Sequence, residues 1–332
     1  MGRPDPQWVF VGGMIRSAST LQYQIARALV VEDLGGSDLG YREAHEIDAF
    51  LDATDAETGE AAPPAPRVVK SHACTPGIRA RLQRGEAVAF YTHRDIRDVV
   101  VSGSRNFGVP VGEFIDGPLI DQAVGEYRLW TSCGRVSVSG FDGIMADPVA
   151  WAAEMAVFLG IEGDSAARGA ELAERFSLDR QRERIKGAAL VEKGGYAVDP
   201  DSLLHRNHID RAASGIWRES LDEAQIREIE LRSRDWLVEA GYAPVHDDGE
   251  LPMAAVLAGL RGRTAAYLQE SDRILQEREE LLESASRDSE QLRSDIEELR
   301  AKLVESQPLR KWLGLHRRRL RNRLDKLRRP VK

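Results

Sequence analysis

The chain has 332 residues, of which 42% are hydrophobic and 30% charged, an ordinary globular mixture with room for one large domain and an appendage. No apolar run approaches the roughly 20 residues of a membrane-spanning helix, and the N-terminus has no apolar signal region, so we expect neither a membrane span nor secretion. Two cysteines, Cys74 and Cys133, exclude a disulfide framework and favour the reducing cytoplasm.

The net charge of −8 conceals a strong asymmetry between the body and the C-terminal end. Residues 309–332 contain eleven Lys or Arg and one acid, whereas residues 1–308 contain 35 basic and 53 acidic residues. An acidic body argues against general nucleic-acid binding. The basic end is a candidate ligand for an anionic lipid or polymer.

The first segments predict the opening unit of a parallel α/β sheet. Residues 8–12 have the pattern of a short buried strand, Gly12 and Gly13 end it, and Ser19 or Thr20 can cap a helix over 21–29. Residues 52–66 are acidic and then rich in Ala and Pro, which predicts an exposed loop. A strand, a glycine-containing loop and a helix in this order are typical of a doubly wound fold.

The alternation of strands and helices continues to about residue 160. We expect a helix from about Asp95, another from Pro148 to Gly160 with proline in its first turn, and more helices up to Tyr242. The remaining strands are expected at residues 67–70, 87–91 and 136–139. The sequence therefore predicts a doubly wound, mostly parallel sheet.

A long helix is predicted beyond the acidic break at 246–250. Apolar residues recur every seven positions and, after polar Asp288, resume the stripe with a phase change: Leu260, Tyr267, Ile274 and Leu281, then Leu292, Ile296, Leu299 and Leu303. This pattern favours a coiled coil that joins copies of the chain, and a single solvated helix is the alternative. We thus expect three parts: residues 1–250, a coiled-coil helix over 251–306, and a basic amphipathic tail over 307–332.

The tail places Trp312 and six leucines among arginines and lysines. Such a segment is typical of peripheral attachment to an anionic membrane surface, which would put the protein at the inner face of the membrane. A disordered basic tail and a nucleic-acid patch are the alternatives.

The loop over residues 12–20 has the position of an anion-binding turn. Backbone N–H groups at a helix N-terminus have no internal partner, and the helix dipole adds positive potential. The loop is P-loop-like, but it lacks the GK(S/T) ending of nucleoside triphosphatases, and its cation is Arg16. It therefore suits a phosphate or sulfate ester better than a Mg-bound triphosphate, while a plain strand-to-helix turn with a surface arginine remains open.

Two further segments end predicted strands and should reach the same edge of the sheet. Lys70 and His72 follow the strand 67–70, and imidazole is suited to accept a hydroxyl proton near neutral pH. Arg94 ends the next strand, and Ser102 lies about two helical turns further on, so the two can clamp a phosphate. The alternatives are a histidine in a surface turn and ordinary surface ion pairs among residues 94–98.

In order, these segments resemble the sulfotransferases that use 3′-phosphoadenosine 5′-phosphosulfate (PAPS). The matching segments are Arg16–Leu21 (the 5′-phosphosulfate loop), Arg67–His72 (a strand ending in Lys-Ser/Thr-His), Arg94–Ser102 (RDPRDVVVS), Phe141–Gly160 (YEDLxxDP and FLG) and Arg211–Trp217 (KGxxGxW). The resemblance covers residues 8–242. Ala18 replaces the usual loop glycine, so the turn must accept a Cβ atom.

The resemblance implies a site and a reaction. His72 would be the general base on the acceptor, Arg16 and Lys70 would stabilise the sulfuryl group and the leaving phosphate, and no metal would be needed. The donor PAPS would be held at its 5′-phosphate by Arg16, Ser17, Ala18, Ser19 and Thr20, and at its 3′-phosphate by Arg94, Ser102 and Arg211. From the basic tail and the predicted coiled-coil helix we expect the acceptor to be a hydroxyl of a carbohydrate or lipid-linked glycan. A small-molecule kinase or nucleotide-binding module using the same loop is the alternative, and a scaffold without activity is a third.

Overall fold

The computed structural model describes residues 6–58, 65–187, 190–193, 196–199, 202–204, 213–246 and 289–298. The chain divides into two units, residues 1–258 and 259–332. In the second unit the described residues form a helix at 289–298, whose Leu292 and Ile296 side chains are exposed. The other residues of the predicted coiled coil, and the whole of the predicted tail, lie outside the described residues.

The centre of the first unit is a five-stranded parallel sheet with the order β2-β3-β1-β4-β5. Its strands are β1 (Trp8–Gly13), β2 (Ser37–Tyr41), β3 (Arg67–Lys70), β4 (Ala87–His93) and β5 (Val136–Gly140). Parallel pairing of β1 with both β3 and β4 brings the carboxyl ends of these three strands to one edge. The predicted doubly wound parallel sheet is confirmed, and all four predicted strands are present.

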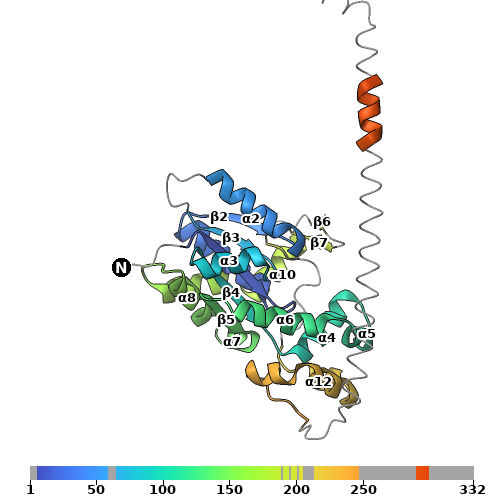
Figure 1. The fold of residues 1–332 in the computed structure, drawn as a ribbon. Helices are drawn as coiled ribbons and strands as arrows, with labels where there is room; N and C mark the ends of the chain where they lie inside the picture. The colour runs from blue at the N-terminus through green and yellow to red at the C-terminus, as the bar shows by residue number, and fades with distance from the viewer. Residues whose placement is uncertain are drawn as a thin grey trace, which may run out of the picture. The chain divides into compact units, whose positions relative to one another are not determined.

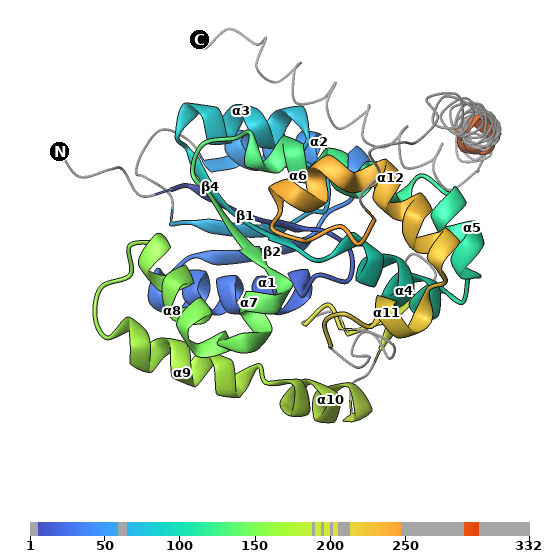
Figure 2. The same ribbon diagram turned by 90° about the horizontal axis from the view of Figure 1, so that it is seen from below.

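Helices cover both faces of this sheet (Figures 1 and 2). In chain order they are α1 (Ser19–Ala28), the π-helix η1 (Leu29–Asp33), α2 (Ala44–Thr58), α3 (Pro76–Arg84), α4 (Ile96–Phe107), α5 (Val111–Asp116), α6 (Leu119–Thr131), α7 (Phe141–Ala146), α8 (Pro148–Phe158), α9 (Ser165–Arg175), α10 (Leu178–Gly187), α11 (Trp217–Ser220) and α12 (Glu223–Glu239). Figure 2 shows α2, α3 and α6 on one side of the sheet and α1, α7 and α8 on the other. A short antiparallel hairpin, β6 (Val191–Lys193) and β7 (Tyr196–Val198), follows α10.

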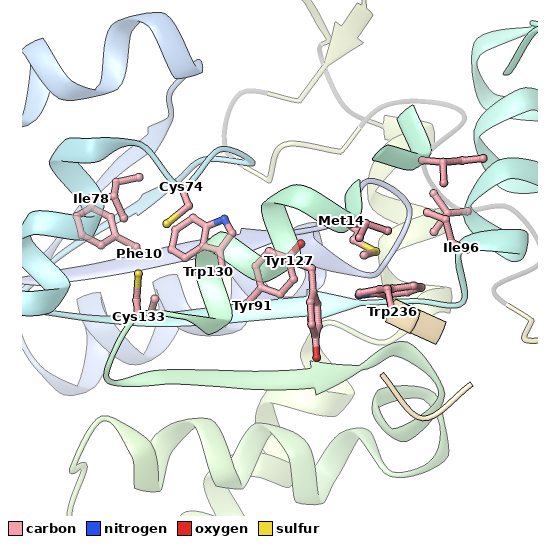
Figure 3. Packing of buried hydrophobic residues seen from close by; sticks show 14 of the residues in the cluster. Phe10, Met14, Cys74, Ile78, Tyr91, Ile96, Tyr127, Trp130, Cys133 and Trp236 are labelled. Atoms are coloured by element: carbon pink, nitrogen blue, oxygen red, sulfur yellow. The ribbon is translucent and has the colours of Figure 1, made fainter. Parts of the chain in front are cut away.

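Alternation along the strands divides the core into two layers. In β1, Trp8 and Phe10 pack with α2, α3 and α6, whereas Val9 and Val11 pack with α1 and α8. Every residue of β1, β3 and β4 is buried, as expected for strands covered on both faces. Figure 3 shows the first layer, in which Trp130 of α6 lies close to Phe10 and Cys74.

Two local predictions were wrong. Residues 52–66 were expected to form a loop, but residues 52–58 are the last part of α2, because Ile47 and Leu51 anchor the preceding turns of that helix in the core. Ser19 or Thr20 was expected to cap α1, but Ala18 occupies the N-cap and the helix begins at Ser19. The hydroxyl of Thr20 contacts Lys70 instead.

Within the residues that the structure describes, no helix has both the length and the hydropathy that crossing a membrane requires.

Candidate functional site

The loop between β1 and α1 is held by β4. Met14 N donates to Thr92 O at 2.9 Å, and the buried Ser17 hydroxyl lies 2.6 Å from Met14 O and 2.9 Å from Thr92 Oγ1. Gly13 has φ +156°, and a Cβ atom there would lie 2.5 Å from Thr92 Oγ1 and 2.8 Å from Ser19 Cβ. The close approach of the loop to β4 therefore requires glycine at position 13.

Two residues of the same loop have left-handed backbone although neither is glycine. Arg16 has φ +60° and Ala18 has φ +69°. An alanine in this region costs on the order of 1 kcal/mol relative to glycine. This bend directs the chain into α1. The first N–H groups of the helix have no helical acceptors, so the start of α1 is a candidate anion-binding site.

Lys70 places a buried cation beside this loop and the start of α1. Its side chain is 4% exposed, and Nζ donates to Thr20 Oγ1 at 2.8 Å. Burial lowers the pKa of Lys70 to about 7, because the charged ammonium has lost most of its water. An anion bound at the loop would restore a strong preference for the charged form.

The ring of His72 is oriented by a backbone carbonyl, and its own backbone is held by a side chain of α6. Nδ1 lies 2.8 Å from Gly13 O, and Trp130 Nε1 donates to His72 O at 3.2 Å. Because a carbonyl oxygen only accepts, Nδ1 carries the hydrogen and the lone pair of the neutral ring lies on Nε2. Burial, and then the charge of Lys70, lower the pKa of His72 to about 4. The ring therefore stays neutral, with Nε2 as a proton acceptor, at physiological pH.

A second group of cationic and hydroxyl side chains joins the loop to α4. Arg16 Nε donates to Ser102 Oγ at 3.0 Å, and Arg94 Nη1 donates to Arg16 O at 3.2 Å. Arg94 is 4% exposed and stacks on the ring of Phe141, with 4.1 Å between the guanidinium carbon and the ring centroid. Burial lowers its pKa, and its Nε atom has no hydrogen-bond acceptor among the described residues.

The structure thus places nine of the ten predicted site residues at the carboxyl edge of β1, β3 and β4. The residues in question are Arg16, Ser17, Ala18, Ser19, Thr20, Lys70, His72, Arg94 and Ser102. Arg211, the tenth, lies outside the described residues. The alternative of surface ion pairs at residues 94–98 is wrong about the surface only: Arg94 pairs with Asp98 at 3.8 Å and Arg97 with Asp95 at 2.7 Å, but all four residues are buried.

Two supporting residues were not predicted from the sequence. Thr92 holds Ser17 and the start of the loop, and Asp98 holds the segment that passes beside Arg94. Asp98, in the first turn of α4, stands four residues after Arg94, near enough along the chain for the two to pair, and this was the available signal. Among the described residues, no group of three or more His, Cys, Asp or Glu is arranged to hold a metal ion.

Known structures share this architecture, although no family profile and no curated protein matches the sequence. The mouse sulfotransferase SULT7A1, complexed with PAP, is 14% identical over 70% of this chain and 85% of that chain, with a TM-score of 0.51. Retinol dehydratase in complex with retinol and PAP is 18% identical over 75% and 84%, with a TM-score of 0.46. A sulfotransferase from Alicyclobacillus acidocaldarius is 14% identical over 53% and 96%, with a TM-score of 0.30. The likeness to SULT7A1 shows that this chain has the sulfotransferase fold.

Proposed function

We propose that the chain is a PAPS-dependent sulfotransferase, which moves a sulfuryl group to an acceptor hydroxyl and leaves adenosine 3′,5′-bisphosphate. The observation that carries the proposal is that the cationic residues at the β1–α1 loop and those at the start of α4 contact one another. Arg16 contacts Ser102 through its side chain and Arg94 through its carbonyl oxygen, and His72 contacts the same loop at Gly13. One bisphosphorylated nucleotide can therefore meet a cationic group at each end, beside a proton acceptor.

The cations of the site fit an anionic donor. Lys70 and Arg94 are both nearly inaccessible to water, and burial lowers the pKa of each. Lys70 has a neutral partner, Thr20, and Arg94 Nε makes no hydrogen bond within the described residues, although Asp98 Oδ2 lies 3.8 Å from it. Buried charges of this kind are stabilised when an anion completes their coordination.

The reaction follows from these positions. The acceptor oxygen attacks the sulfur atom in line with the 5′-phosphate oxygen, and its proton passes to Nε2 of His72. The bond between sulfur and the phosphate oxygen breaks, and the bisphosphate leaves with the electron pair. Lys70 and Arg16 stabilise the negative charge on the sulfuryl group and the leaving oxygen, so that alignment and charge stabilisation supply the catalysis.

The acceptor is proposed to be a hydroxyl of a carbohydrate or lipid-linked glycan. Beside His72, the ring of Tyr41 meets the imidazole edge-on with 5.8 Å between centroids, and its hydroxyl donates to the exposed Glu43 at 3.0 Å. An aromatic ring next to a carboxylate suits a polyhydroxylated molecule, which offers both an apolar face and hydrogen-bond donors. The basic tail and the predicted coiled-coil helix suit an acceptor that lies at a membrane surface.

The donor assignment is tested by calorimetry with two nucleotides. Adenosine 3′,5′-bisphosphate is expected to bind at least about tenfold more tightly than adenosine 5′-phosphate, because a charge-assisted contact contributes about 1.5–3 kcal/mol. Transfer of labelled sulfate from PAPS to a whole-cell glycan and lipid extract then tests the reaction. Equal affinities would contradict a 3′-phosphate site, and Mg-dependent hydrolysis of ATP would support the kinase alternative.

We also propose that residues 251–306 join copies of the chain as a coiled coil and that residues 307–332 bind the inner face of a membrane. The full chain is expected to co-sediment with phosphatidylserine vesicles at about 0.1 M salt, with each cation near the surface contributing about 1 kcal/mol. Neutral phosphatidylcholine vesicles and the triple variant Arg317→Gln, Arg318→Gln, Arg319→Gln are the controls. Equal sedimentation in all three cases would contradict the membrane proposal.

A further inference from the structure

Asp98 is a buried carboxylate at the start of α4. It is 1% exposed, and Oδ2 accepts a hydrogen bond from Gly215 N at 2.7 Å while Oδ1 accepts one from Trp217 N at 3.0 Å. Arg94 Nε lies 3.8 Å from Oδ2. The carboxylate thus connects a cation of the proposed 3′-phosphate site with a segment more than a hundred residues later in the chain.

The segment 213–217 is folded onto Arg94 by these contacts. Arg94 Nη2 donates to Ala213 O at 2.5 Å, and Gly215 has the left-handed φ of +76°. Trp217 is fixed at the end of the segment, because Arg97 and Arg218 each stack on its ring, with the guanidinium carbons 4.0 and 4.3 Å from the centroid.

Asp98 has no role as a direct ligand of an anion, because its charge is negative and both of its oxygens are occupied by donors. Its effect on the nucleotide must pass through Arg94 and through the backbone at 213–217. An asparagine in its place could accept one of the two N–H groups, but its amide nitrogen would then face the other donor. The segment would lose one anchor, and Arg94 would lose its nearest negative charge.

We propose that Asp98 is a positioning residue for the 3′-phosphate of the donor: it sets the direction of Arg94 and docks the segment 213–217 beside it. This inference rests on the proposed function and goes beyond it, since it assigns nucleotide selectivity to a carboxylate that does not touch the nucleotide.

Glu230 supplies a matched control. It is also fully buried, it accepts from Val245 N at 2.9 Å and His246 N at 3.1 Å, and it pairs with Arg97 at 2.5 Å. Its chemistry is that of Asp98, but the backbone that it holds directly is 243–246, and it reaches the segment 213–217 only through Arg97, which stacks on Trp217. Glu230→Gln and Asp98→Asn therefore remove the same kind of interaction from two different places.

The experiment compares the affinities of adenosine 3′,5′-bisphosphate and adenosine 5′-phosphate in the full chain, by calorimetry, with the thermal midpoint as a check of folding. In Asp98→Asn the ratio of the two affinities is expected to fall at least tenfold, while the affinity for the 5′-phosphate stays within twofold. In Glu230→Gln the ratio is expected to stay within twofold. The variant Gly215→Ala disturbs the same segment at its own backbone, because a φ of +76° disfavours a Cβ atom, and it is expected to lower the ratio even if Asp98→Asn does not fold.

The outcomes separate the two proposals. A wild-type protein that discriminates between the nucleotides, together with Asp98→Asn and Gly215→Ala variants that discriminate equally well, would overturn the positioning role alone. An equal fall of the ratio in Glu230→Gln would also overturn it, since the direct contacts of Asp98 with the segment 213–217 would then have no special effect. A wild-type protein that binds the two nucleotides equally would overturn the proposed function and this inference with it.

Discussion

Replacing His72 by alanine is expected to lower the turnover of sulfuryl transfer by about 10²–10⁴-fold, the usual contribution of a general base. The structure supplies the reason, because the bond from Nδ1 to Gly13 O leaves Nε2 as the proton acceptor of the neutral ring. The measurement is the transfer of labelled sulfate from saturating PAPS to an active acceptor. Turnover near that of the wild type would remove His72 from this role.

Asparagine at position 72 separates catalysis from support of the loop. Its side-chain amide can donate to Gly13 O as Nδ1 does, but it has no basic atom in the place of Nε2. We expect His72→Asn to keep the donor affinity and thermal midpoint of the wild type and to lose turnover as fully as His72→Ala. A recovery of turnover in His72→Asn would mean that the histidine acts only by holding the loop.

The pKa of His72 predicts how the activity and the stability of the wild type depend on pH. The pKa of His72 is lowered from 6.5 to about 4, so protonation removes the base only in strongly acidic solution. The acid limb of kcat/KM for the free enzyme is expected near pH 4. Between pH 6.5 and pH 4 the unfolded chain binds more protons at this residue, so the stability contribution of the neutral ring is present above pH 6.5 and is lost as the pH falls through this window.

Replacing Lys70 by methionine is expected to lower turnover by about 10²–10³-fold, the usual effect of removing one donor to a developing negative charge. Lys70 also makes donor binding a proton-uptake reaction. Its pKa of about 7 leaves it mostly neutral at pH 8 in the free protein, and a bound anion favours the ammonium form. Close to one proton per site should therefore be taken up when the bisphosphate binds at pH 8.

Calorimetry at pH 8 in two buffers of different ionisation enthalpy measures this uptake. The apparent binding enthalpy should differ between the buffers for the wild type, whereas Lys70→Met should show no difference. Lys70→Arg is the matched control, because arginine stays protonated at every accessible pH and so keeps the charge without the uptake. Equal enthalpies in both buffers for the wild type would contradict the assignment.

The sequence predicted the central strands and most of the site, because both depend on local patterns. The buried runs at 8–12, 67–70 and 87–91 have the composition of covered parallel strands, and site residues follow each of them. Once the sheet is parallel, its topology brings these strand ends together.

What could not be predicted depends on contacts between distant segments. The strand β2, with the sequence Ser-Asp-Leu-Gly-Tyr, has too few apolar residues to be recognised, and it is a strand because it pairs with β3 at the edge of the sheet. The acidic end of α2 has the composition of a loop. It is helical because the buried residues Ile47 and Leu51 fix the preceding turns of the helix. Asp98 looked like a surface charge, because nothing local indicates that Gly215 and Trp217 reach it.

The left-handed residues Arg16 and Ala18 have a consequence for substrate choice. Ser17, Met14 and Thr92 fix the loop in this shape by contacts within the protein. The protein therefore loses little freedom of its own when a ligand enters, and affinity reflects how well the ligand matches an existing contour. If this loop holds the 5′-phosphate as proposed, a nucleotide with a longer or branched chain there is expected to bind more weakly, because the loop cannot widen without breaking these contacts.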